Sequence, residues 1–189
     1  MNFKRLYNSL ISPIIINPKK RANYFKKRKI YRHIGENVII QTKRMPLYPN
    51  LISIDDNTII ASNVMFLTHD VVHSVLNKYL SENIFSENIG CISIGKNCFI
   101  GSNTSILYNI KIGDNSIVSA GSIVTKDIPN GEIWGGVPAK KIGTIDDYIM
   151  KLKNNPKYPN HLKPKNLEID LELEEFMWKK FVSDRQNKN

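Results

Sequence analysis

The residue of this chain best suited to proton transfer is His69, and it stands at an unusual place in a repeat. From Ile34 to Asp127, with interruptions at 46–53 and 72–93, the chain consists of hexads that begin with an apolar residue and most often carry Asn fourth. In the hexad FLTHDV the fourth residue is instead His69. An imidazole, with an ordinary pKa of about 6.5, can accept a hydroxyl proton near neutral pH. The alternative is that His69 only lets the chain turn, because His adopts positive φ more readily than most residues.

The hexads predict a solenoid of short strands joined by tight corners. A period of six fits neither the 3.6-residue turn of a helix nor the alternation of a long strand. Three hexads close one coil, as from Ile94 to Ile112, and stacked coils share one apolar interior. We expect the first side chains to face this interior: Ile34, Ile40, Ile54, Ile60, Phe66, Ile94, Ile100, Ile106, Ile112, Val118 and Val124. We expect the small fifth side chains to fill the narrow part of each coil: Val38, Thr58, Val64, Cys98, Thr104, Ser116 and Ser122.

The repeats resemble those of the hexapeptide-repeat acyltransferases, most clearly in IGKNCFIGSNTSILYNIKIGDNSIVSAGSIVTKDIPNGEIWGGVPAKKIG. The stretch VMFLTHD makes them most similar to the sugar and capsular polysaccharide O-acetyltransferases. The resemblance implies an all-β fold, a left-handed parallel β-helix with helical N- and C-terminal extensions. The expected organisation is a basic arm at 1–33, the β-helix at 34–142 with a loop insertion at 72–93, and a C-terminal helical extension at 143–189.

The same resemblance implies roles for residues near the insertion. His69 matches the family's general base, which takes the proton of a sugar hydroxyl while the hydroxyl oxygen attacks acetyl-CoA directly, with no acyl-enzyme. Asp70 is expected to orient the imidazole or contact the substrate, although a solvated corner carboxylate is an equal alternative. His73 and Phe85, within the insertion, are expected to contact the acceptor. Asn50, in the irregular stretch QTKRMPLYPN, is a further candidate for this contact.

The expected donor site lies in the later coils. Ser102 matches a residue beside the thioester, and its backbone N–H is the candidate oxyanion donor. Ala120 matches the small residue beside the pantetheine arm, and Thr125 matches a polar group of the donor site. Both Ser102 and Ala120 would also suit a small-residue solenoid without any ligand.

Two lysines are expected to bind the donor's phosphates. Lys126, in VTKD, and Lys140, in GGVPAK, match the cations of the family's donor site. A second phosphate-binding position of the family is Gly143 here, and Lys141 is the candidate to replace it. The plain alternative is that these lysines are surface cations.

The expected function is O-acetylation of a surface polysaccharide or its precursor by a homotrimer whose active sites lie between subunits. N-acetylation of an amino sugar or nucleotide-amino-sugar is an alternative, because an amine also loses a proton. Some hexapeptide solenoids hold zinc with three histidines, but here only His69 and His73 are neighbours, so no metal is expected. An alternative of another class is a non-catalytic assembly or membrane-binding solenoid, which would have no reason to retain GGVPAK.

The net charge of +10 lies in the first 33 residues, which contain ten Lys and Arg and no acid. Such a segment, interleaved with apolar residues, can contact an anionic membrane. It can equally pack on a neighbouring subunit or on the open end of the solenoid. No recognition motif accompanies the charge, so nucleic acid is not an expected partner.

The remaining features predict location and the C-terminal helices. Because no apolar run is long enough to span a bilayer and the two cysteines form no redox motif, we expect a cytoplasmic protein, with the arm as a peripheral contact to the inner face of the membrane. Thr144 and Asp147 predict a helix over Ile145–Asn154. A later helix is expected to bury one stripe of side chains: Leu173, Phe176, Met177 and Phe181.

Overall fold

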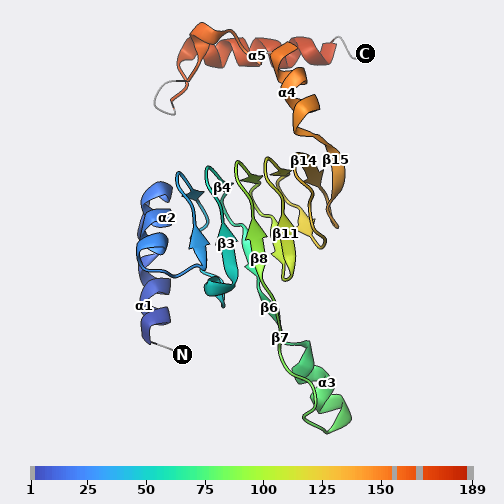
Figure 1. Ribbon diagram of the computed structural model, residues 1–189. Coiled ribbons are helices and arrows are strands. Elements are labelled where there is room, and N and C mark those ends of the chain that lie inside the picture. The colour runs from blue at the N-terminus through green and yellow to red at the C-terminus, as the bar shows by residue number, and fades with distance from the viewer. Residues whose placement is uncertain (1–2, 155–156, 165–167, 187–189) are drawn as a thin grey trace. The chain divides into compact units, whose positions relative to one another are not determined.

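The computed structural model describes residues 3–154, 157–164 and 168–186, with side chains from Arg5 onward. The chain divides into two compact units, Met1–Asp146 and Asp147–Asn189. The first unit contains a β-helix with two helices before it (Figure 1). The second unit is helical.

Three sheets of short strands form the faces of the β-helix. The first sheet contains β1 (His33–Ile34), β3 (Ile52–Ile54), β8 (Ile92–Ile94) and β11 (Ile110–Ile112). The second contains β2 (Ile39–Ile40), β4 (Ile59–Ile60), β9 (Phe99–Ile100), β12 (Ile117–Val118), β14 (Glu132–Gly135) and β15 (Lys140–Thr144). The third contains β5 (Met65–Leu67), β10 (Ser105–Leu107) and β13 (Ile123–Val124). All pairs within these sheets are parallel except β14 with β15.

The interior is the one that the hexads predict. Each of the first side chains is buried, and most, such as Ile54, Ile94 and Ile112, have no exposed surface. These three residues are stacked in register through β3, β8 and β11. The fifth side chains are buried as well. Each buried aliphatic side chain stabilises the fold by about 1.5–3 kcal/mol, so the left-handed β-helix rests on this stack.

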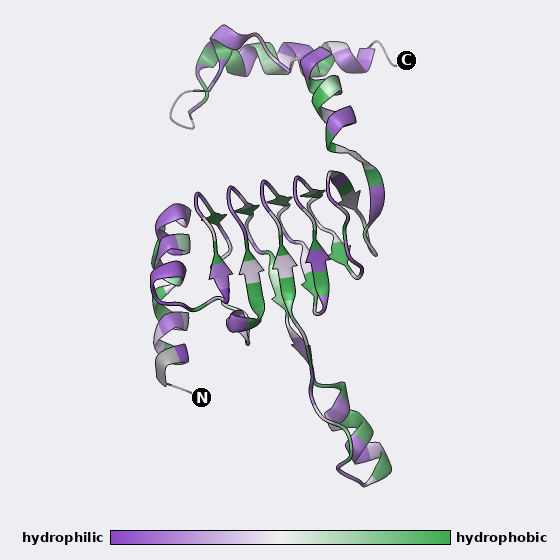
Figure 2. Ribbon diagram, in the orientation of Figure 1, coloured by the Kyte–Doolittle hydropathy of each residue, from purple (hydrophilic) through white to green (hydrophobic). Residues whose placement is uncertain are grey.

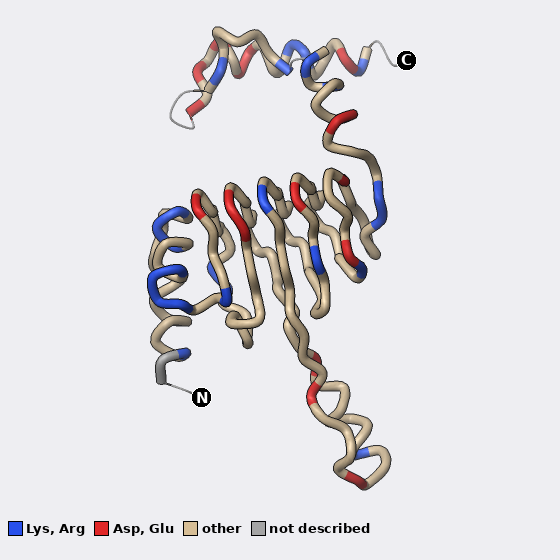
Figure 3. Tube along the Cα trace, in the orientation of Figure 1, with Lys and Arg blue, Asp and Glu red and all other residues tan. Residues whose placement is uncertain are grey.

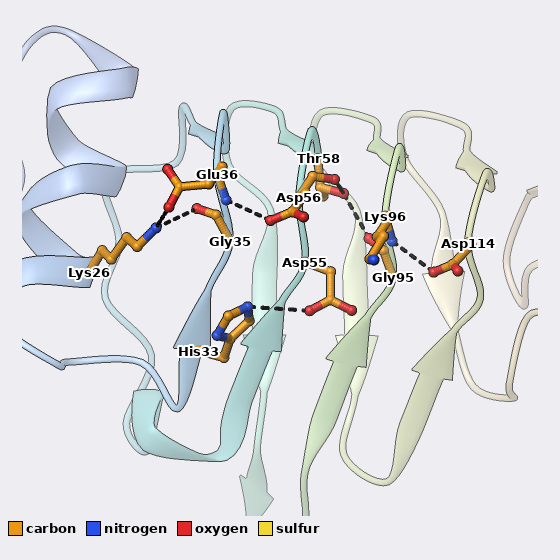
Figure 4. Close-up of polar contacts among 10 residues, drawn as sticks. All are labelled: Lys26, His33, Gly35, Glu36, Asp55, Asp56, Thr58, Gly95, Lys96 and Asp114. Atoms are coloured by element: carbon orange, nitrogen blue, oxygen red, sulfur yellow. Dashed lines mark hydrogen bonds and ion pairs between the residues drawn. The ribbon is translucent and has the colours of Figure 1, made fainter.

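Corners join the sheets, and their fourth residues turn the chain. At the first corner, between the first and second sheets, Asn37, Asn57, Asn97 and Asn115 have φ of 55–56°. Their side chains form a ladder in which each amide donates to the next coil, over 3.1, 3.2 and 2.9 Å. A second set of contacts runs beside this ladder, where the Lys96 N–H donates to Asp114 across 2.8 Å (Figure 4). Gly95 is required there, because a Cβ would lie 2.8 Å from the Asp114 nitrogen.

The basic arm packs on the open end of the β-helix. It forms α1 (Phe3–Ile11) and α2 (Pro18–Lys27), and α2 lies against β1 and β2 (Figure 1). Arg21 of α2 is 1% exposed and donates to the carbonyls of Ile40 at 2.8 Å and Gln41 at 2.9 Å, which the first coil leaves open. Of the expected alternatives, packing on the open end is therefore observed, while the membrane contact stays a prediction.

The insertion leaves the β-helix after β5. β6 (His69–Asp70) leads into the insertion, which contains α3 (Val72–Leu80) and β7 (Asn88–Ile89), and β6 and β7 are antiparallel. The helix projects from the coils (Figure 1), and its apolar residues, whose ribbon is green in Figure 2, have exposed side chains. The insertion is therefore not a loop with its apolar residues packed beneath it.

The C-terminal unit contains α4 (Ile145–Asn154) apart from its first two residues, a 3₁₀ turn at Asn160–Leu162 and α5 (Leu171–Gln186). The predicted bounds of α4 are confirmed. The predicted stripe on α5 is only partly correct: Leu173 is buried, but Met177 and Phe181 are exposed, because the short unit has too few residues to cover a 16-residue helix. None of the described helices has the length and hydropathy that a membrane span requires.

Candidate active site

His69 lies at the third corner, between the third and first sheets, where the insertion begins. Its backbone pairs with Ile89 across β6 and β7. The residues with positive φ include Asn63, Asn103 and Asn109, but His69 is not among them. The need for a corner residue that tolerates positive φ therefore does not explain this histidine.

The imidazole of His69 packs against a tyrosine of the first coil. The rings of Tyr48 and His69 are edge to face, with centroids 5.4 Å apart and planes at 76°. The side chain of His69 is half-buried, and its Nδ1 is buried without a hydrogen-bond partner among the described residues. The imidazole therefore has one nitrogen that no described residue engages, as a proton-accepting group requires.

Tyr48 is itself fixed by the insertion. Its hydroxyl donates to Glu87 Oε2 at 2.9 Å, and this hydrogen bond is the main reason why the pKa of Tyr48 is raised. The first coil, the third corner and the returning end of the insertion therefore meet at His69. Sequence reasoning missed Tyr48 because QTKRMPLYPN carries no repeat, and the only available signal was that departure from the hexad.

Asp70 ties the insertion to the next coil. Its Oδ2 accepts hydrogen bonds from Tyr108 at 2.7 Å and from Asn88 at 3.3 Å, and its Oδ1 accepts from the Val72 N–H at 3.0 Å. The Tyr108 hydrogen bond is the largest cause of the lowered pKa of this carboxyl. These contacts do not include the imidazole, so the structure gives no support to the expectation that Asp70 orients His69. Sequence reasoning also missed Tyr108 and Asn88.

The other expected acceptor residues are spread over the insertion and the first coil. His73, in the first turn of α3, has its Nε2 3.3 Å from Ser74 Oγ, and its Nδ1 has no partner within the described chain. Phe85 is 42% exposed, on a loop that Asn77 holds through its backbone. Asn50 is exposed in the 3₁₀ turn Pro49–Leu51, two residues beyond Tyr48.

Ser102 and Ala120 stack at the second corner, between the second and third sheets, where the Gly121 N–H donates to the Ser102 carbonyl at 2.8 Å. At the first corner the corresponding N–H, of Lys96, is bonded to the carboxylate of Asp114. Ala120 occupies at the second corner the position that Asp114 occupies at the first, but its side chain has no oxygen that could accept a hydrogen bond. The Ser102 N–H therefore has no acceptor among the residues described. An unpaired N–H beside a small side chain is what an oxyanion donor requires.

The lysines of the expected donor site differ in their contacts. Thr125 and Lys126 are exposed at the third corner of the fourth coil, and Lys140 is exposed at the start of β15. Lys141 is instead paired with Glu132 at 2.7 Å, and this hydrogen bond is the largest cause of the lowered pKa of Glu132. Lys141 is therefore engaged within the chain, whereas Lys140 has no acidic partner in the described part.

The candidate residues fall on two edges of the third sheet. His69, Thr125 and Lys126 lie on one edge, at the third corner, and Ser102 and Ala120 lie on the other, at the second corner. A single chain therefore does not bring His69 and Ser102 together. Within the described residues there is also no group of three or more His, Cys, Asp or Glu that could hold a metal ion.

Residues 91–126 match the family described as "Hexapeptide repeat of succinyl-transferase". The chain is 40% identical over 172 residues to protein CapG of Staphylococcus aureus, covering 89% of this chain and 95% of that protein. It is 35% identical over 135 residues to the putative acetyltransferase YvoF of Bacillus subtilis, covering 70% and 72%. It is 40% identical over 116 residues to the galactoside O-acetyltransferase of Escherichia coli, covering 61% and 55%.

The fold has solved counterparts. A galactoside acetyltransferase in complex with coenzyme A matches with a TM-score of 0.60 and 27% identity over 88% of both chains. A hexapeptide-repeat acetyltransferase of Vibrio cholerae, VCA0836, matches in fold with a TM-score of 0.57, at 22% identity over 74% of this chain and 87% of that one. Since the hexads, the β-helix and these relatives agree, the chain belongs to the hexapeptide-repeat acyltransferases.

Proposed function

We propose that this enzyme transfers an acetyl group from acetyl-CoA to a sugar hydroxyl of a surface polysaccharide or its precursor. The observation that carries the proposal is the setting of His69: a half-buried imidazole with an unpartnered Nδ1 at the root of an exposed insertion. An acyltransferase class and an acetyl-CoA donor accord with the family. The similarity to a galactoside O-acetyltransferase favours a sugar hydroxyl as the acceptor.

The reaction needs one proton acceptor and one oxyanion donor. His69 takes the proton of the acceptor hydroxyl while the oxygen of that hydroxyl attacks the thioester carbonyl. The backbone N–H of Ser102 stabilises the negative charge that develops on the carbonyl oxygen. The C–S bond then breaks, the ester is released, and the proton on His69 passes to the departing coenzyme A sulfur.

Assembly completes this site in the proposal. Because His69 and Ser102 lie on opposite edges of the third sheet, the His69 edge of one protomer would face the Ser102 edge of the next, as in a homotrimer. Lys126 and Lys140 would bind the phosphates of the donor, and the small side chain of Ala120 would leave room for the pantetheine arm. The apolar face of the insertion, including Phe85, would form a wall for the acceptor.

The test is acetyl-CoA turnover with a panel of neutral, amino and phosphorylated sugars, measured as thiol release with mass spectrometry of the product. His69→Asn should lower kcat by about 10²–10⁴-fold while acetyl-CoA still binds. His161→Asn, which changes an exposed histidine in the C-terminal unit, is the matched control and should be fully active.

Three results would contradict the proposal in different ways. Acetylation of amino sugars alone, giving an alkali-stable amide, would favour the N-acetyltransferase alternative. Equal losses in the two histidine variants would remove His69 from the chemistry. Failure of the wild type to bind acetyl-CoA or to release thiol with any acceptor would favour a non-catalytic solenoid.

A further inference from the structure

A pocket opens beside the first coil, apart from the donor residues described above. Its volume is about 480 Å³. Figure 3 shows that Lys and Arg gather on α2 and on the segment leading into β1, which border it. Its polar lining consists of Lys26, Lys29, Tyr31, Arg32, His33 and Asn50.

The charge of this pocket is only partly neutralised by the protein. Lys26 is paired with Glu36, and His33 lies 3.4 Å from a carboxylate oxygen of Asp55 (Figure 4). Lys29 and Arg32 are exposed and have no acidic partner among the residues that the structure describes. Two cations that are close in the chain and lack a counter-ion favour an anionic ligand.

Tyr31 supplies an independent indication of a ligand. Its side chain is 4% exposed and lines the pocket, but its buried hydroxyl has no hydrogen-bond partner within the described chain. A buried hydroxyl without a partner is unfavourable, so such groups are rare in folded proteins. Burial raises the pKa of Tyr31, which keeps the phenol protonated and able to donate. A ligand oxygen that reaches this hydroxyl from the pocket would satisfy it.

The pocket is close to the proposed catalytic base along the chain. Asn50 lines the pocket, and Tyr48, two residues earlier, contacts the His69 ring. Two residues of extended chain span at most about 7 Å. One residue of the pocket wall therefore lies near the residue that contacts His69, which is the arrangement that a ligand with an anionic group beside its sugar requires.

We propose that this pocket binds the phosphate or diphosphate group to which the acceptor sugar is attached, so that the substrates are phosphate-linked sugars. Arginine and lysine cations together with neutral O–H and amide N–H donors match the several acceptor oxygens of a phosphate ester. The role in substrate choice rests on the proposed function, whereas phosphate binding does not. The phosphate could belong to a lipid carrier or to a water-soluble sugar phosphate, and both have the same chemistry.

The first experiment is titration calorimetry of inorganic pyrophosphate into the full-length protein. The double variant Lys29→Gln/Arg32→Gln should bind it about tenfold more weakly or worse, as expected when charge-assisted hydrogen bonds are removed. The control Lys20→Gln/Lys27→Gln removes the same charge from exposed positions of α2 outside the pocket and should bind normally. Equal losses in both variants, or no binding by the wild type, would overturn the proposal.

Tyr31→Phe tests the pocket without changing its charge. Because the hydroxyl has no partner in the chain, the variant should melt at the same or a higher temperature, yet bind pyrophosphate several-fold more weakly. Undiminished affinity in a folded Tyr31→Phe variant would count against a ligand at this hydroxyl.

Two further arms separate the sources and the functions. Displacement of bound pyrophosphate by phosphatidylcholine vesicles containing phosphatidic acid, but not by phosphatidylcholine alone, would indicate a lipid-borne phosphate; displacement only by glycosyl phosphates would indicate a soluble one. Acetyl transfer to methyl glycosides without pyrophosphate binding would overturn the pocket and leave the proposed function intact. If pyrophosphate binds and the double variant abolishes this binding, but no acceptor is acetylated, the phosphate-binding pocket stands and the proposed function is overturned.

Discussion

The carboxylate of Asp70 accepts a 2.7 Å hydrogen bond from the hydroxyl of Tyr108, a residue of the following coil. Asn88, on the returning strand of the insertion, donates to both groups, at 3.3 Å to Asp70 and at 2.6 Å to Tyr108. The start of the insertion, its end and the third coil are thereby joined directly beside His69. This cluster fixes the strand that carries the proposed base without contacting its imidazole.

Tyr108→Phe should impair catalysis because the strand that carries His69 would be held less firmly in place. The substitution keeps the ring but removes the hydroxyl, so β6 and β7 lose their link to the third coil. We expect kcat for acetyl transfer to fall several-fold while KM for acetyl-CoA is unchanged, which steady-state kinetics will show. The matched control is Tyr24→Phe, which removes a hydroxyl bonded at 2.7 Å to Asn8 in the basic arm. If both variants are equally active, the cluster has no role in positioning His69.

The same hydrogen bond should make stability depend on pH. The Tyr108 hydrogen bond and then the Val72 N–H hold the pKa of Asp70 below its ordinary value. The unfolded chain therefore takes up this proton at a higher pH than the folded chain does, so the stabilisation is present above about pH 4 and is lost as pH falls through the lowered pKa. The difference in urea midpoint between the wild type and Tyr108→Phe should be constant near neutrality and narrow below about pH 4. A difference that widens in acid would contradict the assignment.

The asparagine ladder at the first corner allows backbone and side-chain effects to be separated. Asn97 has a φ of 55°, accepts from Asn57 at 3.2 Å and donates to Asn115 at 2.9 Å. Asn97→Gly loses the ladder but keeps the left-handed conformation, whereas Asn97→Ala loses both. We expect the alanine variant to be less stable than the glycine variant by about 1 kcal/mol in urea unfolding. Equal stabilities would mean that the ladder alone selects asparagine here.

Lys140→Ala should weaken donor binding. Lys140 is exposed and has no acidic partner within the described chain, so its charge is available to a phosphate. We expect KM for acetyl-CoA to rise about tenfold with little change in kcat, as for the loss of one charge-assisted hydrogen bond. Lys96→Ala, an exposed lysine at the first corner, is the control. An equal rise in the control would assign the effect to overall charge.

The hexads predicted the interior because each coil gives a first side chain the same surroundings. Ile54, Ile94 and Ile112 are stacked in register although residues 72–93 interrupt the sequence between the first two. Repetition could not predict contacts made by segments outside the repeat. Tyr48, which contacts His69, belongs to an irregular stretch. Tyr108 and Asp70 are 38 residues apart and form a hydrogen bond because the chain resumes the stacked coils after the insertion.

The basic arm shows a second limit of prediction from sequence. Ten cations without an acid leave membrane contact and packing on the open end of the solenoid as equal alternatives, and isolated charges are costly to bury. Arg21 is nevertheless buried, since the first coil offers carbonyl oxygens that no preceding coil can use. Which of the ten cations binds these carbonyl oxygens depends on the angle at which α2 packs on the coil, and the composition of the arm does not specify that angle.

Arg21→Met should therefore destabilise the β-helix from its open end. The guanidinium donates to the carbonyls of Ser12, Ile15, Ile40 and Gln41, and methionine would leave all of these acceptors without it. We expect a loss of about 3 kcal/mol or more in free energy of unfolding, because each hydrogen bond from a charged donor contributes about 1.5–3 kcal/mol. Lys20→Met, at an exposed position of the same helix, should change stability by less than about 0.5 kcal/mol.

Hydrogen exchange would locate the effect: in Arg21→Met the amides of β2 and β4 should lose protection before those of β12, because opening begins where the cap is lost. Uniform loss of protection along the coils would show that Arg21 supports the whole fold cooperatively and that the first coil cannot open by itself.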